Sequence, residues 1–308
     1  MKTYVPDYYP EFACIAGKCR HSCCVGWEID IDEDSLARFR QAQGEIGLRL
    51  KRDIVETEDG AFFRLKEHDR CPFLNDENLC DLIIALGEES LCQICADHPR
   101  FRSFFADRTE MGLGLCCEEA ARLILTRTEK TKLILWEDDG EDDLPDEDEQ
   151  ELLLVRRALI DVVQDRSLPV EERVERMLAM TGIEMPQRTM AEWAAFFLGL
   201  ERLDEGWTAR LDALVQAADE PAVNIPDHAQ EQLLVYLLTR HMPGAAEDGD
   251  MQGRLMLCVL LWQLVRAIAA REQADMEALI DIARMCSSEM EYSDENLQAI
   301  LDEIADIQ

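Results

Sequence analysis

Four cysteines stand close together near the start of the chain, in the segment "CIAGKCRHSCC" from Cys14 to Cys24. Further cysteines follow in "CPFLNDENLC", "LCQIC" and "LCC", so that ten of the twelve lie in the first 117 residues. Thiolates are the preferred ligands of zinc, and about four of them hold an iron–sulfur cluster. A gathering of this many thiols predicts a metal centre rather than ordinary core packing.

The spacing of the cysteines leaves the identity of the metal open. Neither the paired CxxC motifs of a zinc ribbon nor the cysteine run of a bacterial ferredoxin is present, so a [4Fe–4S] cluster and zinc both fit. His21, His68 and His98 are conceivable additional ligands, but ordinary surface or hydrogen-bonded histidines are more frequent. Cys258 and Cys286 stand apart from the others and are expected to be small core residues.

Charge and hydropathy limit the partners and the compartment. The net charge of −34 disfavours nucleic acids and anionic membranes, whereas it can attract basic protein segments. The N-terminus "MKTYVPDYYPEF" has no apolar signal segment, and the apolar stretch 255–270 is too short and too polar to span a bilayer. We therefore expect a cytoplasmic protein, in which reduced thiols bind metal rather than form disulfides.

Composition predicts a mainly α protein, because Ala, Leu, Glu, Arg and Met dominate its long segments. Residues 1–125 form a predicted cysteine-rich domain that binds a metal or an iron–sulfur cluster. Residues 126–150 form a predicted acidic linker, because "EDDGEDDLPDEDEQE" at 137–151 has too little apolar surface to bury. Residues 151–308 form a predicted helical bundle.

The elements that must position the cysteines are short. Helices are expected from Asp32, from Cys80 to Gly87 and from about Cys116, and a strand pair is expected between "WEIDI" and "AFFRLK". In the second half, apolar residues recur with helical spacing from Leu152 onward, and Ser293 is a predicted N-cap. The later helices are expected at 170–180, 190–202, 206–218, 228–241, 251–271, 274–287 and 293–306.

Three blocks, "FACIAGKCRHSCCVGWEIDID", "CPFLNDENLCDLIIALGEESLCQICADHPR" and "LCCEEAARLIL", resemble the flagellin lysine-N-methylase family. That family is itself similar to the CxxxCC class of zinc- or iron-chelating proteins. The resemblance covers about the first 125 residues, and Cys92 and Cys116 look additional to its pattern. The metal ligands that it implies are Cys14, Cys19, Cys23, Cys24, Cys71, Cys80, Cys95 and Cys117.

The resemblance implies that the chain transfers methyl groups from S-adenosylmethionine to surface lysines of flagellin or another lysine-bearing protein, with a cysteine-bound [4Fe–4S] cluster. Displacement of the methyl group by the lysine needs a neutral amine and a proton acceptor, but no single carboxylate is distinguished as the base.

The segment "MGLGLCC" favours a turn before a helix over a nucleotide-binding loop, because no preceding strand is expected. "HPRFRSFF" favours a strand or helix edge whose arginines pair with acids over an adenine-stacking site.

Two other functions fit the same residues. The first is a non-enzymatic module that binds zinc or iron or senses redox state, and whose helical domain binds a partner protein. The second is a zinc site that only stabilises the fold.

Overall fold

The computed structural model divides the chain into two compact units. It describes all residues except 59, 141–143, 145, 218–220, 223 and 308. The cysteine unit comprises Ala13–Arg100, and the helical unit comprises Met1–Phe12 with Phe101–Gln308. The described part of the chain is mainly helical, as its composition predicts.

The two units follow other boundaries than the composition-based domains 1–125, 126–150 and 151–308. The cysteine unit is an insertion between the first two strands of the helical unit. The reason is backbone pairing: strand β1 (Lys2–Pro6) pairs in parallel with β6 (Arg108–Leu113) and antiparallel with β7 (Leu133–Asp138). Composition cannot reveal this pairing, because the partners are more than a hundred residues apart.

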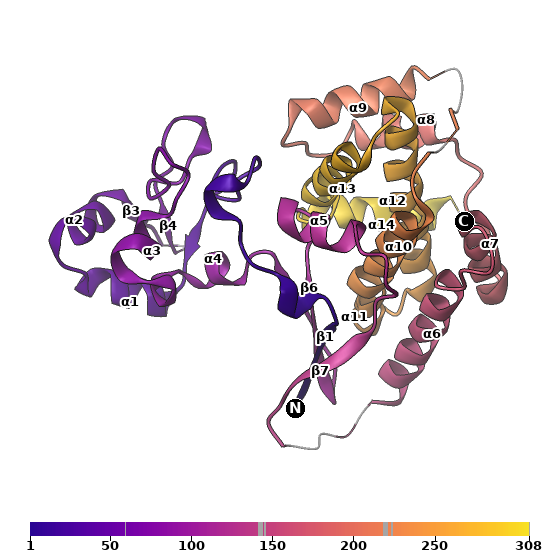
Figure 1. Cartoon of the computed structure of the whole chain (residues 1–308), viewed down its shortest axis with the longest axis horizontal. Coiled ribbons are helices and arrows are strands. Elements are labelled where there is room, and N and C mark those ends of the chain that lie inside the picture. The colour runs from indigo at the N-terminus through magenta and orange to yellow at the C-terminus, as the bar shows by residue number, and fades with distance from the viewer. Residues whose placement is uncertain (59, 141–143, 145, 218–220, 223, 308) are drawn as a thin grey trace. The chain divides into compact units, whose positions relative to one another are not determined.

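The sheet of the helical unit has the order β5-β6-β1-β7, with β5 at Arg100–Phe104 (Figure 1). β5 lies at one edge of the sheet, which confirms the strand-edge part of the interpretation of "HPRFRSFF", whereas the pairing of its arginines with acids stays a prediction. A turn precedes helix α5 (Glu118–Leu125), as expected, but the expectation that no strand comes before it is wrong. Strand β6 ends with residues Met111–Leu113. The sequence did not distinguish this end of the strand from a loop, because two glycines interrupt the apolar residues of "MGLGLCC".

The acidic segment contributes to two elements, although it was expected to be a linker. β7 ends at Asp138, and helix α6 spans Glu147–Val163, starting five residues before the predicted Leu152. Asp146 caps this helix, because its side chain accepts hydrogen bonds from the amides of Asp148 and Glu149. Acidic residues at the positive end of a helix are stabilising, so negative charge favours this start. Residues 141–143 and 145 of the segment lie outside the described residues.

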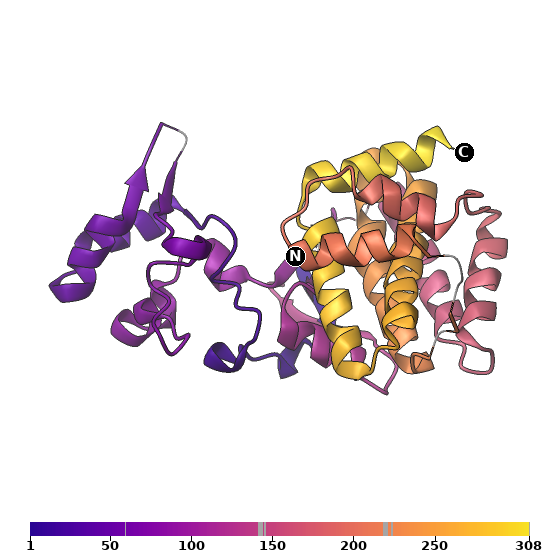
Figure 2. The ribbon, with the colours of Figure 1, turned by 90° about the horizontal axis from the view of Figure 1, so that it is seen from above.

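Helices α10 (Asp227–His241) and α12 (Met251–Glu272) run through the centre of the helical unit (Figures 1 and 2). Both are buried on nearly all sides, and their side chains form a continuous core with α5 and α13. Ser293 caps the last helix, as predicted, by accepting a hydrogen bond from the amide of Asn296 at 3.2 Å. The other helices of this unit are α7 (Val170–Thr181), α8 (Met190–Phe197), α9 (Glu205–Val215), α11 (Ala245–Asp248), α13 (Met276–Met290) and α14 (Asp294–Asp306).

These helices lie close to the predicted ranges. α8 stops at Phe197 instead of residue 202, and α9 stops at Val215. The predicted end of α9, residue 218, lies outside the described residues. The stretch 255–270 was expected to be too short and too polar to span a bilayer, but α12 extends it at both ends and is long and apolar enough to do so. However, 78% of its most apolar window is buried inside the structure. That burial is typical of a core helix.

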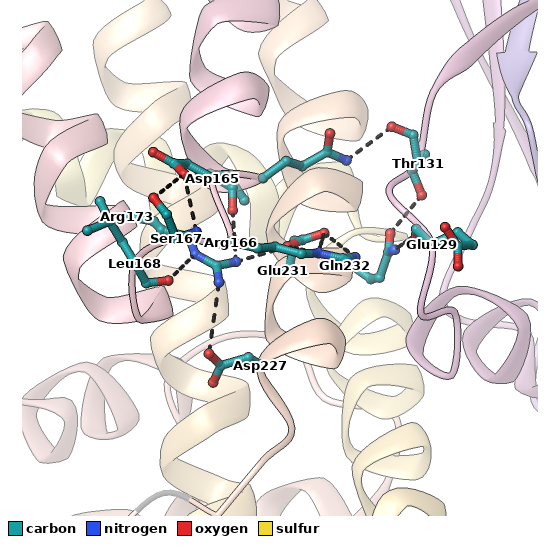
Figure 3. A network of polar contacts seen from close by, with 12 residues as sticks. Glu129, Thr131, Asp165, Arg166, Ser167, Leu168, Arg173, Asp227, Glu231 and Gln232 are labelled. Atoms are coloured by element: carbon teal, nitrogen blue, oxygen red, sulfur yellow. Dashed lines mark hydrogen bonds and ion pairs between the residues drawn. The ribbon is translucent and has the colours of Figure 1, made fainter.

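A polar network joins α6, α7 and α10 (Figure 3). Glu231 is fully buried on α10 and accepts hydrogen bonds from Arg166 and Arg173 at 2.9 Å. Thr131 donates to Gln232 at 2.7 Å, which ties the segment before β7 to the same helix. Two guanidinium groups on one carboxylate satisfy its lone pairs, so this buried charge holds the helices in place.

The cysteine unit is built on a small sheet and short helices. The predicted strand pair is confirmed, because β2 (Asp30–Ile31) pairs antiparallel with β4 (Ala61–Phe63), which also pairs with β3 (Ile54–Glu56). Helix α1 starts after Asp32, close to where a helix was expected, and Asp32 caps it, while the α3 helix ends before Gly87. The unit's α-helices are α1 (Glu33–Gln41), α2 (Gly44–Asp53), α3 (Asp81–Leu86) and α4 (Gln93–Asp97). Its core includes Phe39, Phe63 and Phe73.

Candidate metal centre

Two cysteine segments that are distant in sequence meet through backbone hydrogen bonds in the cysteine unit. The amide of Cys71 donates to the carbonyl of Cys24 at 2.9 Å, and Val25 forms a β-bridge with Arg70. Gly26 adopts a positive φ of 96°, which a residue with a side chain rarely adopts. The "CCVGW" block is thereby fixed against the "CPFLN" block.

The loop from Cys71 to Cys80 returns on itself. The side-chain oxygen of Asn75 accepts from the amides of Glu77 and Leu79 at 3.0 Å, and Leu74 forms a β-bridge with Cys80. Arg49 from α2 holds the loop at both ends, by donating to the carbonyl of Pro72 at 3.0 Å and to Asp81 at 2.7 Å. The local turn chemistry of asparagine therefore brings Cys80 back towards Cys71.

Cys92 and Cys95 lie at the start of α4, with their Sγ atoms 3.3 Å apart. Cys92 is fully buried in the core of the unit, next to Cys71 in the same apolar cluster. The resemblance did not include Cys92 among the ligands. The CxxC spacing between Cys92 and Cys95 is the signal that could have placed Cys92 among the predicted ligands, since two thiols at this spacing can bind one metal from the start of a helix.

Five thiols line the apolar core of the cysteine unit, where they influence one another's charge. Burial, together with negative charge on Cys24 and Cys80, raises the pKa of Cys71 to about 12. The hydrogen bond to Cys92, burial and the charges of Cys92, Cys24 and Cys71 raise the pKa of Cys95. We call this set, Cys24, Cys71, Cys80, Cys92 and Cys95, the core thiol cluster.

Two members of the core thiol cluster are shifted towards the thiolate. A hydrogen bond from Cys23 lowers the pKa of Cys24 to about 7, with Ser22 and the charge of Arg70 acting in the same direction. The hydrogen bond between the Cys92 and Cys95 thiols lowers the pKa of Cys92. Several thiolates this close together in an apolar core would repel one another, and a bound cation would compensate that charge.

The donor set fits a thiophilic metal or an iron–sulfur cluster, because every member of the core thiol cluster is sulfur. Two thiolates on one tetrahedral ion lie about 3.8 Å apart, close to the 3.3 Å between Cys92 and Cys95. Among the described residues, no group of three Cys, His, Asp or Glu side chains has the arrangement of an assembled metal site. The thiols are instead hydrogen-bonded to one another and to the backbone.

The other predicted ligands are placed differently. Cys14 and Cys23 are exposed, and Cys19 is partly exposed and donates to the carbonyl of His21 at 3.3 Å. Cys117 lies in the helical unit, where it precedes α5, and Cys116 is its neighbour there. Four of the eight predicted ligands, Cys24, Cys71, Cys80 and Cys95, thus line the same apolar core as Cys92.

His98 is the most buried of the three candidate histidines. Burial and the charge of Arg100 lower its pKa to about 4, so its ring is neutral at physiological pH. Its Nε2 atom is buried and has no hydrogen-bond partner among the described residues. The Trp27 ring lies 6.2 Å away.

The helical unit contains a second polar cluster, which the sequence analysis missed. The buried carboxylate of Glu291 accepts from Tyr236 at 2.6 Å and from Ser287 at 2.5 Å, and lies 2.9 Å from Nε2 of His241. Although burial opposes ionisation, the hydrogen bond and charge of His241, the charge of Arg240 and the hydrogen bond from Ser287 lower the pKa of Glu291 to about 2. We call it the Glu291 cluster.

Comparison of the amino-acid sequence with known proteins finds distant similarity to a small set of bacterial proteins. A lysine-N-methylase of Salmonella typhimurium is 24% identical over 126 residues, which cover 39% of this chain and 31% of that protein. The similarity is to lysine methylases. A flagellar biosynthetic protein FliU of Salmonella muenchen is 23% identical over 126 residues, which cover 75% of its length.

The chain thus spans about a third of the methylases that it resembles. No family model matches it, and no solved structure is similar to it. The similarity points to a distant relationship with lysine-N-methylases and with FliU.

Proposed function

We propose that this chain is a protein-lysine N-methyltransferase that transfers methyl groups from S-adenosylmethionine to surface lysines of flagellin. The observation that carries the proposal is the similarity to two lysine-N-methylases and to FliU. The core thiol cluster supports it, because these thiols belong to the blocks on which the family resemblance rests. We also propose that the protein acts in the cytoplasm, because its substrate would be made there.

The cysteine unit would hold a [4Fe–4S] cluster, with zinc as the alternative metal. Cys24, Cys71, Cys80, Cys92 and Cys95 are the nearest set of donors, and Cys14, Cys19, Cys23 and Cys117 are the further candidates. When bound with an open iron position, such a cluster could ligate the amino-carboxylate end of S-adenosylmethionine.

The chain's own residues would bind and orient the lysine. A net charge of −34 attracts a basic substrate segment over several ångströms, and a less polar contact surface favours the neutral amine that must attack the methyl carbon. The proton released from the amine passes to a carboxylate or to water. The large number of carboxylates leaves the base unassigned.

The test combines metal analysis with methyl transfer. The protein is purified anaerobically, its iron, sulfide and zinc are measured, and labelled S-adenosylmethionine is supplied with flagellin. We expect iron and sulfide together with labelled flagellin, and we expect Cys71→Ala to lose both. Cys286→Ala, which removes a buried thiol from the helical unit, is the matched control. No label on flagellin with a loaded protein would contradict the proposed methyl transfer, and zinc without iron would exclude the iron–sulfur cluster in favour of the alternative metal.

One observation favours a second candidate, a redox-sensing module whose helical unit binds a partner protein. The 3.3 Å separation of the Cys92 and Cys95 Sγ atoms suits a reversible disulfide. A mild oxidant such as a peroxide would accept two electrons and two protons from the two thiols as the sulfur–sulfur bond forms. Mass spectrometry after such treatment should then find a 92–95 disulfide in preference to every other pair. Retention of both thiols under these conditions excludes this candidate.

A further inference from the structure

Arg240, in the last turn of α10, holds its guanidinium group against two aromatic rings of the helical unit. The guanidinium carbon lies 4.3 Å from the centre of the Phe101 ring on β5 and 5.3 Å from that of Tyr292, which follows α13. Aromatic faces attract a guanidinium group through its charge and do not use up its N–H groups as a carboxylate does. The two rings therefore restrict the position of Arg240 and leave its N–H groups able to donate.

The position of Phe101 depends on a glycine of the neighbouring strand. A Cβ atom at Gly112 on β6 would come within 2.3 Å of the Phe101 ring, so only a residue without a side chain fits there. Phe101 belongs to the segment "HPRFRSFF" and Gly112 to "MGLGLCC". These two segments thus meet beside Arg240.

Arg240 has no acidic partner among the residues that the structure describes, none of which forms an ion pair with it or accepts its hydrogen bonds. The chain holds 65 Asp and Glu against 31 Lys and Arg, so an arginine without a partner acid is unexpected. Buried arginines elsewhere in this unit are paired, as Arg156 is with Glu110. Arg240 is only partly buried and Tyr292 is 46% exposed, so a ligand can reach the guanidinium group from solvent.

The weakly acidic groups that Arg240 faces do not supply the missing negative charge. Burial raises the pKa of Cys116 to about 12, so its thiol is neutral at physiological pH. Burial likewise raises the pKa of Tyr292 and of Tyr236, which keeps both hydroxyl groups neutral. The positive charge of Arg240 therefore meets no phenolate or thiolate.

Glu291 is an ionised carboxylate near Arg240, but it has a closer cationic partner. His241 lies 2.9 Å from its carboxylate, and the charge of His241 lowers the pKa of Glu291 more than that of Arg240 does. The N–H groups of Arg240 thus remain available for an anion from outside. Because Glu291 adds negative charge nearby, a single carboxylate suits this place better than a doubly charged phosphate.

We propose that Arg240 binds the carboxylate of a small ligand by donating two parallel hydrogen bonds to its oxygens. This inference rests on the proposed methyl transfer, under which the ligand is S-adenosylmethionine, whose methionine end carries one carboxylate. Arg240 then fixes the methyl donor in the helical unit. An open iron position in the cysteine unit is the competing place for the same carboxylate.

Two nucleosides that differ in the carboxylate test the assignment on the anaerobically purified, metal-loaded protein. S-adenosylhomocysteine keeps the amino-carboxylate end of the methyl donor, whereas methylthioadenosine lacks it. Isothermal titration calorimetry compares their binding to the wild type, Arg240→Gln and Arg240→Lys. Arg240→Gln should weaken S-adenosylhomocysteine binding by about tenfold or more, because a charged pair of hydrogen bonds is lost. Arg240→Lys should lose less, since it keeps the charge, and methylthioadenosine binding should stay unchanged in both.

Arg157→Gln is the matched control, because it removes an exposed arginine from the same unit and should change neither affinity. Equal weakening of both nucleosides by Arg240→Gln would overturn the assignment, because Arg240 would then only support the fold. Unchanged S-adenosylhomocysteine binding in Arg240→Gln would also overturn it, and a shift of the iron–sulfur absorption on adding this nucleoside would then place the carboxylate on iron. A wild type that binds neither nucleoside would contradict the proposed methyl transfer itself and, with it, this assignment.

Discussion

At the scale of single residues, burial distinguishes the cysteines and the charged side chains of this chain from one another. Cys71 and Cys92 are buried in an apolar core, whereas Cys14 of the same cysteine-rich region is exposed. Glu291 is 5% exposed and still ionised, because three side chains hydrogen-bond to it. The two predictions at this scale concern these groups.

The first prediction separates two cysteines that the family resemblance left out. Cys92→Ser should lower the amount of metal bound by the purified protein by more than half, because Cys92 belongs to the core thiol cluster. Cys116→Ser, in the helical unit, should leave the metal content unchanged. Metal analysis of both variants, purified in parallel under anaerobic conditions, makes the comparison. Equal metal content in the two variants would remove Cys92 from the ligand set.

The second prediction concerns the Glu291 cluster and pH. Because the pKa of Glu291 falls from an ordinary 4.5 to about 2 on folding, its stabilising contribution is complete above pH 4.5 and is lost as the pH falls towards 2. Glu291→Gln should lower the free energy of unfolding at pH 7 by about 3 kcal/mol. The difference between variant and wild type should shrink as the pH falls below 4.5. Urea unfolding at a series of pH values measures it, and a constant difference would contradict the assignment.

At the scale of secondary-structure elements, a buried ion pair joins the sheet to the helices. Arg156 on α6 donates to both carboxylate oxygens of Glu110 on β6, at 2.6 and 2.7 Å. Both side chains are nearly inaccessible to solvent. The pair fixes the position of α6 against the sheet, because an unpaired charge at this depth is strongly unfavourable.

This arrangement gives a third prediction. Arg156→Met should destabilise the protein by about 3 to 5 kcal/mol, because it leaves the Glu110 carboxylate buried without its partner. Combining it with Glu110→Gln should recover most of that loss, since neither charge then remains. Chemical denaturation of both single variants and the double variant measures the coupling. Additive effects would show that the two side chains act independently.

Helix capping gives a fourth prediction at the same scale. Ser293→Ala should cost about 1 kcal/mol of stability, because it removes the acceptor for the amide of Asn296 at the start of α14. Ser293→Asp should retain most of the stability, since a carboxylate caps the same amide and suits the helix dipole. Thermal unfolding of the two variants makes the comparison, and equal losses would mean that the cap contributes little.

At the scale of the whole molecule, the cysteine unit interrupts the sequence of the helical unit but has its own apolar core. Residues 13–100 should therefore respond to metal loss separately. We predict that a chelator speeds hydrogen exchange across this range, while α10 and α12 keep their protection. Exchange measured by mass spectrometry with and without chelator tests this. Uniform loss of protection over the whole chain would show that the two units unfold together.

The sequence by itself determined the elements whose signals are local. The apolar spacing of the second half, the cap Ser293, the helix start near Asp32, and the alternation around "WEIDI" and "AFFRLK" predicted helices and strands that the structure contains. Such signals arise from contacts within one turn or one strand pair, so a short window of sequence carries them. The cysteine blocks likewise indicated a relationship to lysine methylases before any fold was considered.

Only the tertiary structure decided how distant segments combine. Pairing of β1 with β6 and β7 makes residues 13–100 an insertion, and this pairing depends on contacts across more than a hundred residues. Membership of Cys92 in the core thiol cluster, and of Glu291 in its buried network, depends equally on which elements pack together. Spacing gives the reach of a side chain along its own segment, whereas packing determines which other segments meet it.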